Sequence, residues 1–143
     1  MEKYSLKQII EDVTDVIANN SINIQSVEYT GAIDVNMTKA KDFPKVYMIA
    51  DESGSIDDNI NTLLVRFLFC DVQRGRLDEW VRDYEVKSDM QLEASMLFDR
   101  LQSDGYSIEF PISYQPISGE YNDGLAGVEC TVTFNLNKPC YGV

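Results

Sequence analysis

The chain has 143 residues, of which 44% are hydrophobic and 25% charged, and it carries a net charge of −12 without any histidine. This is the composition of an ordinary globular domain, and a chain of this length buries about two-thirds of its unfolded surface. The missing histidine excludes Ser-His-Asp and Cys-His catalysis. The acidic balance argues against specific binding to nucleic-acid phosphate.

Neither a membrane span nor a secretion signal is predicted. The longest apolar run, around residues 67–70, is far shorter than the roughly 20 residues that a membrane helix needs. Residues 1–5 lack the basic start and apolar stretch of a signal peptide. The three cysteines, Cys70, Cys130 and Cys140, have no zinc-site spacing. We therefore expect a protein that is made and kept in a cytoplasm, without metal or cofactor, and with Cys70 and Cys130 buried in its core.

The first predicted element is a helix over residues 6–18. Ser5 and Gln8 have the spacing of a capping box, and apolar residues follow at intervals of three, four and seven along one helical face. Asn19 and Asn20 are expected to end the helix, because asparagine tolerates the left-handed cap conformation.

Strands are predicted next, over residues 22–29, 46–50 and 62–72, with a returning partner at 32–37. The near-continuous apolarity of the third strand indicates burial on both faces. The composition of residues 51–55 favours a turn.

An exposed part is also expected in this half of the chain. Residues 38–44 read as an exposed loop, and a projecting loop or hairpin is expected around residues 31–60.

Two helices are predicted in the second half of the chain. A short one over residues 77–84 would expose Trp80 and Tyr84. A separate one would begin at Ser88, whose capping-box partner is Gln91, and would stop at residues 104–105.

The last third is predicted to return to the sheet. Pro111 interrupts residues 106–114 and places them at a sheet edge or a bulge. Residues 115–124 read as a polar loop, and residues 125–136 alternate as a strand with one core face. The whole chain is therefore predicted to be a single α+β domain, residues 1–143. Its sheet should be mainly antiparallel, with four to six strands. The two main helices, over residues 6–18 and from Ser88 onward, should both pack on one face of this sheet.

Carboxylate clusters are the obvious catalytic candidates in a chain without histidine. They are Asp51-Glu52, Asp57-Asp58, and Asp78-Glu79 with Asp83 and Glu85. Such groups hold divalent metals or divide acid and base roles. These clusters fall in predicted loops and lack the spacing of a calcium loop, so we interpret them as a solvated surface. We expect no enzyme.

Candidate subunit-interface residues fall in two groups. One is the lysine cluster around the predicted loop, and the other combines arginines with aromatic residues, the types enriched at interface hot spots. The alternative for the tryptophan is that it caps the core. The candidates are Lys39, Lys41, Lys45, Arg76, Trp80, Arg82 and Tyr84.

Three short stretches resemble phage tail-terminator-like proteins. Residues 121–128 (YNDGLAGV) place an aspartate and a Leu-Ala-Gly step before a long alternating strand. Residues 86–91 (VKSDMQ) open a helix, and residues 138–140 (KPC) close the chain. The order of elements is similar over nearly the whole length, although residues 32–60 match no motif. The similarity is to small neck and ring proteins of phages and prophages of gut bacteria, including the crAss-like podoviruses.

The resemblance implies a tail-terminator-like fold and a structural virion protein. Such a subunit would form a homo-oligomeric ring, six-fold or twelve-fold, in the head–tail connector or tail. It would line the DNA channel and join portal-side and tail-side layers. Its partners would be other neck, tail or portal proteins, with genomic DNA passing unbound. It would be made in the host cytoplasm and end in the virion, and the family has no catalytic, cofactor or metal residues to carry over.

Other functions remain open at this point. An acidic inhibitor that mimics DNA fits the charge, but basic residues interrupt the acidic stretches. A carboxylate enzyme, such as a metal-dependent hydrolase, is weakened by the missing histidine. A cytoplasmic protein-interaction module of another kind is the remaining alternative.

Overall fold

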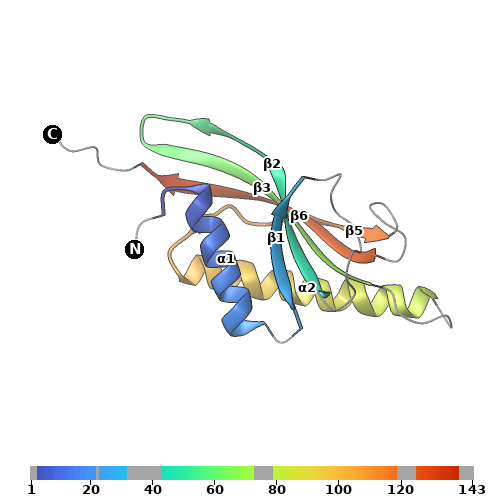
Figure 1. The fold of residues 1–143 in the computed structure, drawn as a ribbon. Helices are drawn as coiled ribbons and strands as arrows, with labels where there is room; N and C mark the ends of the chain where they lie inside the picture. Colours follow the sequence, from blue (N-terminus) through green and yellow to red (C-terminus); the bar gives the residue numbers. More distant parts are fainter. Residues whose placement is uncertain (1–2, 22, 32–42, 73–78, 119–124, 139–143) are drawn as a thin grey trace.

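The computed structural model of the chain describes residues 3–21, 23–31, 43–72, 79–118 and 125–138, with the backbone alone for 72, 79–83 and 118. In this part the fold is α+β, with two helices and a mixed sheet of six strands that is mostly antiparallel (Figure 1). The predicted fold class is confirmed. The predicted partner strand at 32–37 lies outside the described residues.

The first helix, α1 (Leu6–Asn20), begins as predicted. The Gln8 amide donates to Ser5 Oγ at 3.3 Å, and the Ser5 amide donates to Gln8 Oε1 at 3.1 Å, which completes the capping box. The prediction of a left-handed backbone conformation at the end of this helix is wrong. The cap is Ser21, which is extended (φ −77°, ψ 138°) and donates its amide to the Ile17 carbonyl. Its hydroxyl also donates to Glu93 of the other helix, so a tertiary contact fixes this end.

The sheet has the order β1-β2-β3-β6-β4, and β5 also pairs with β6. Only β1 runs parallel to its neighbour among the described pairs; the others are antiparallel. Because β6 pairs with β3 on one side, β4 and β5 share its other side as successive edge strands. The strands are β1 (Ser26–Thr30), β2 (Lys45–Ile56), β3 (Ile60–Val72), β4 (Ser107–Ile108), β5 (Tyr114–Ser118) and β6 (Leu125–Asn137).

The turn predicted at residues 51–55 is wrong, because β2 continues through it. A register shift between Ile49 and Ser53 absorbs the polar residues as a bulge. At Gly54 an added Cβ would lie 1.9 Å from the Thr62 carbonyl oxygen, so glycine permits the close approach of β3. Cross-strand pairing thus overrides the local turn composition, and the chain reverses only after Asp57, whose amide donates to the Ile60 carbonyl.

The second helix is one long element, α2 (Glu79–Ser103), so the predicted break at Ser88 is wrong. Neither glycine nor proline occurs within it, and Val86, Met90 and Ala94 continue one buried face at helical spacing. Its predicted end is confirmed. Gly105 has φ 110°, and the Tyr106 amide donates to the Leu101 carbonyl at 3.1 Å, as in a Schellman cap.

The polar loop predicted at residues 115–124 is wrong in its first part, which forms β5; residues 119–124 lie outside the described part. The predicted edge position of Pro111 is confirmed, since it falls between β4 and β5. The alternation predicted for β6 is also confirmed.

Both helices lie on one face of the sheet (Figure 1). The main core fills the space between the helices and this face. Phe67 of β3 lies at its centre, with ring centroids 5.1 Å from Phe98 of α2 and 6.3 Å from Phe134 of β6. The opposite face carries a second buried cluster, because alternate strand residues point the other way. Its members are Phe43, Tyr47, Ile49, Leu68, Cys70, Ile117 and Leu125.

Candidate functional site

Arg66 organises the charges on the sheet face opposite the helices. Its Nε donates to Glu129 Oε1 at 2.8 Å, and its Nη1 pairs with Asp51. Burial alone would lower the pKa of Arg66, but the hydrogen bonds to Asp51 and Glu129 raise it. The guanidinium therefore pairs with two carboxylates, of which Asp51 belongs to a cluster that the sequence offered as a catalytic candidate. Their arrangement is that of a structural ion cluster.

Lys45 differs most from its predicted role, because it is the first residue of β2 and only 6% exposed. Its ammonium lies 3.3 Å from Glu28 Oε1 and 4.8 Å from the centroid of the Tyr47 ring. Burial of a lysine requires such partners within the chain. The predicted exposed loop therefore ends before Lys45, and this side chain is bound within its own subunit.

The remaining predicted interface residues are only partly described. Lys39, Lys41 and Arg76 lie outside the described residues. For Trp80 and Arg82 only the backbone is described, as part of α2. Tyr84 is the one described candidate that is a freely accessible aromatic, at 72% exposed. Among these candidates the described side chains are therefore Lys45, which is buried beside Glu28, and Tyr84, which is exposed on α2.

Part of the sheet projects beyond the rest of the domain, and the sequence did not show which residues form this projection. We call residues 53–62 of β2 and β3, with residues 135–137 of β6, the wing. Figure 1 shows the hairpin of β2 and β3 reaching away from both helices. Residues 53–56 are all exposed, and Ile56 near the tip is 86% exposed. Pairing between β1 and β2 ends at Ile49, so in the described part of the chain no strand covers the outer edge of residues 53–56.

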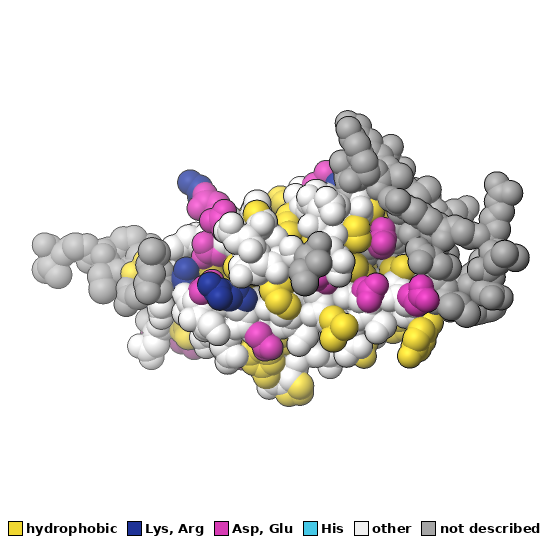
Figure 2. Space-filling view, turned by 90° about the horizontal axis from the view of Figure 1, so that it is seen from below, with side chains coloured by type: hydrophobic (Ala, Val, Ile, Leu, Met, Phe, Trp, Pro, Cys, Tyr) yellow, Lys and Arg dark blue, Asp and Glu magenta, His cyan; other side chains and the backbone are white. Residues whose placement is uncertain are grey.

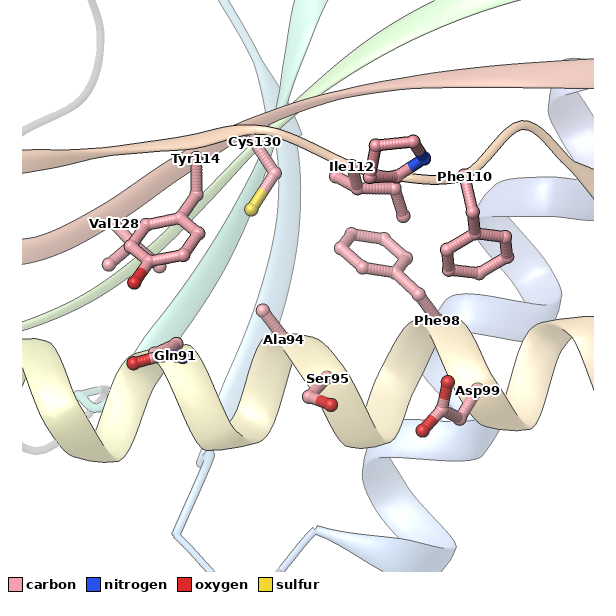
Figure 3. Close-up of a pocket in the computed structure, with 11 residues that line it drawn as sticks. Gln91, Ala94, Ser95, Phe98, Asp99, Phe110, Ile112, Tyr114, Val128 and Cys130 are labelled. Carbon is pink, nitrogen blue, oxygen red and sulfur yellow. The ribbon is translucent and has the colours of Figure 1, made fainter.

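A groove separates α2 from residues 110–114, which lead into β5 and include its first residue. We call these residues the edge segment. Its deeper part encloses about 270 Å³, with Ala94, Phe98 and Cys130 along its apolar lining. Phe110 and Tyr114 stand over it from the edge segment, and each is 48% exposed (Figure 3). Gln91 lies on the helix side (Figure 3). The groove is thus walled by aromatic residues on one side and by polar helix residues on the other.

The groove continues along α2 into a wider, shallower part. Gln91, Tyr114 and Val128 line both parts. Tyr84 and Lys87 lie at one end, and Asp99 lies at the other. Tyr84 and Asp99 are fifteen positions apart, which corresponds to about 22 Å of helix. The two ends therefore differ in charge, with a cation at one and a carboxylate at the other.

The helix-covered surface combines acidic and apolar side chains. In Figure 2, which views this side, magenta and yellow side chains alternate over much of the described surface, and the dark blue ones gather mainly toward one end. Leu92, which is 65% exposed, adds an apolar side chain beside the groove, because it lies one helical turn from Ser88 and Ser95. In the described part of the chain, four of the seven exposed large hydrophobic residues thus lie on α2, just before β5 or at its first residue: Tyr84, Leu92, Phe110 and Tyr114.

The two described cysteines are buried, as predicted. Burial raises the pKa of Cys130, in the groove, to about 12, and it raises the pKa of Cys70 on the other sheet face to about 12 as well. Because the thiolate is the nucleophile, neither thiol has the chemistry of a catalytic cysteine near neutral pH.

The carboxylate clusters do not assemble into a metal site in the described part of the chain. Glu52 accepts a hydrogen bond of 2.7 Å from the Tyr29 hydroxyl, and Asp57 caps its own turn through the Asp58 amide. Among the described residues no group of three or more cysteine, aspartate or glutamate side chains could hold a metal ion. Within the same residues, neither helix is both long and apolar enough to cross a membrane.

Sequence reasoning missed the residues that shape the wing tip and the groove: Ile56, Phe110 and Tyr114. The available signals were weak. An isoleucine between polar residues and a phenylalanine before a proline stand outside the apolar periodicities. No protein-family model and no curated protein matches the chain.

Proposed function

We propose that the chain is a structural subunit of a homo-oligomeric ring in a phage head–tail connector or tail. In this proposal the ring lines the DNA channel and joins portal-side and tail-side layers. The short stretches that resemble tail-terminator-like proteins support it, as does the order of helices and strands. The neighbours of such a ring would be other neck, tail or portal proteins.

The wing is the observation that carries the proposal. A monomer gains little from a long hairpin whose residues 53–56 are exposed and whose outer edge is uncovered in the described part of the chain. Open strand edges and exposed apolar tips are liabilities that proteins otherwise avoid. Contact with another subunit would cover both the edge and Ile56. The wing is therefore best explained as an arm between subunits.

The charge of the chain fits a channel through which DNA passes. At −12 per copy, a ring of six copies carries −72 (6 × 12). A negative wall repels the phosphate backbone and lets DNA move without sticking. Three of the described cationic groups fit this proposal, because Lys3, Lys45 and Arg66 are each paired with a carboxylate of the same chain.

The proposal is tested by measuring the mass of the purified full-length chain by native mass spectrometry. We expect closed species of six or twelve copies at moderate salt, and the protein as a component of purified phage particles. A chain that stays monomeric and is missing from particles would contradict the proposal. If it instead bound and inhibited a nuclease in equimolar amounts, the DNA-mimic alternative would replace the ring.

A further inference from the structure

Two apolar features of the described surface lie at opposite ends of the sheet. Ile56 near the wing tip opposes Asn61 of β3, whereas Val128 of the groove opposes Phe69 of the same strand. Eight residues along β3 separate these positions, which corresponds to about 26 Å. One chain therefore cannot place its own Ile56 in its own groove. A neighbouring copy can.

We propose that Ile56 of one subunit docks into the groove of the next copy, at the point where the two parts of the groove meet. This inference rests on the proposed ring, and it names the two surfaces that build it. The contact joins two different patches, so it is heterologous and propagates from subunit to subunit until the ring closes.

The shapes of the two features fit each other. Ile56 follows Ser53, Gly54 and Ser55, whose small side chains leave the isoleucine as the projecting group. The deeper part of the groove, about 270 Å³, lies below the roughly 300–1,000 Å³ of typical small-molecule sites. It has room for one aliphatic side chain between Phe110 and Tyr114 on one wall and α2 on the other. The deeper part of the groove is thus large enough for a projecting aliphatic side chain.

The charges set the direction of docking. Asp57 and Asp58 follow Ile56 at the tip, and both are exposed. Lys87 lies at one end of the groove and Asp99 at the other. With Ile56 seated beside Gln91, the tip carboxylates approach Lys87 and stay away from Asp99. The opposite direction would place like charges together, which costs free energy at an interface.

The test uses two variants of the full-length chain. Ile56→Asp removes the projecting side chain, and Gln91→Trp fills the groove from an exposed helix position that lines both of its parts. We expect each variant to fold normally and to weaken self-association by roughly ten- to a hundredfold, because the apolar contact is lost. The control Ile56→Val should assemble like the unmodified chain, because it keeps an apolar tip.

Mixing the two variants gives the sharpest result. Each retains one intact surface, so the mixture should form one-to-one heterodimers that do not grow into rings. If the unmodified chain forms rings and both variants do too, the docking is wrong while the proposed function stands. If only Gln91→Trp is excluded from particles, the groove holds another protein, and the docking is again wrong. A chain that never self-associates would contradict both the docking and the ring.

Discussion

Tyr106, just after α2, donates a hydrogen bond of 2.6 Å from its hydroxyl to Asp12 Oδ2 of α1, 94 residues earlier in the chain. The same oxygen lies 2.9 Å from Lys3 Nζ, which sits 4.8 Å from the centroid of the tyrosine ring. The Lys3 carbonyl in turn accepts the Asn137 amide at 2.8 Å, at the end of β6. The Asp12 carboxylate therefore links α1 to the N-terminal segment and to the residues just after α2, and Lys3 extends this link to the last strand.

We expect Asp12→Asn to lower the free energy of unfolding by about 1–2 kcal/mol, because it replaces charge-assisted hydrogen bonds with weaker ones. Burial raises the pKa of Asp12, but the hydrogen bonds from Tyr106 and Lys3 outweigh it, so the net pKa is lowered. A lowered pKa in the folded state contributes stability above the unfolded value, about 3.9, and this contribution is lost as the pH falls through the folded value.

Urea denaturation at a series of pH values measures this effect. The difference between the original chain and Asp12→Asn should shrink as the pH falls below about 4. Glu11→Gln is the matched control, since Glu11 is exposed and forms only an i,i+4 pair of 4.0 Å with Lys7. It should change stability by less than about 0.5 kcal/mol. A difference that did not depend on pH would mean that Asp12 acts through packing alone.

The register of β6 predicts opposite outcomes for two adjacent residues. Phe134 is fully buried between Phe67 and Tyr106, with ring centroids 6.3 and 5.7 Å away. Phe134→Ala should cost about 3–5 kcal/mol, because it leaves a cavity in the core. Thr133→Ala, on the other face, should cost less than about 0.5 kcal/mol. Equal losses in thermal or urea unfolding would show that the register is wrong.

The buried cysteines should react only when the chain unfolds. In a Cys140→Ser variant the remaining thiols are Cys70 and Cys130, and burial raises the pKa of each to about 12. At pH 8 the thiolate fraction is then about one in ten thousand, so labelling by a disulfide reagent should follow the opening of the fold. Adding urea should speed the labelling steeply. Rapid labelling of either thiol in the native protein would contradict the assigned burial.

The two capping-box sequences explain how far the sequence alone could lead. Ser5 and Gln8 form the box, but Ser88 and Gln91, at the same spacing, lie within a continuous helix. The two pairs differ in the residues that precede them. Val86 already belongs to the buried face that continues through Met90, so core packing extends the helix past a local start signal.

The sheet shows the same division between local and long-range information. The alternation of β6 was readable because a single strand with one core face carries its own period. The passage of β2 through residues 51–55 was not, because it depends on pairing with β3 and on the close approach at Gly54. The groove depends on two elements distant in sequence, α2 and the segment before β5. No local pattern contains that relationship.

Electron microscopy of the intact phage neck would show whether the proposed ring exists. We expect a six-fold or twelve-fold ring around the DNA channel, built from this α+β fold, with the wing of each subunit seated on α2 of its neighbour. Chemical cross-links between Asp58 and Lys87 of adjacent copies should agree with that density. Particles whose neck density lacks this fold, or rings in which the wing contacts no neighbouring subunit, would contradict it.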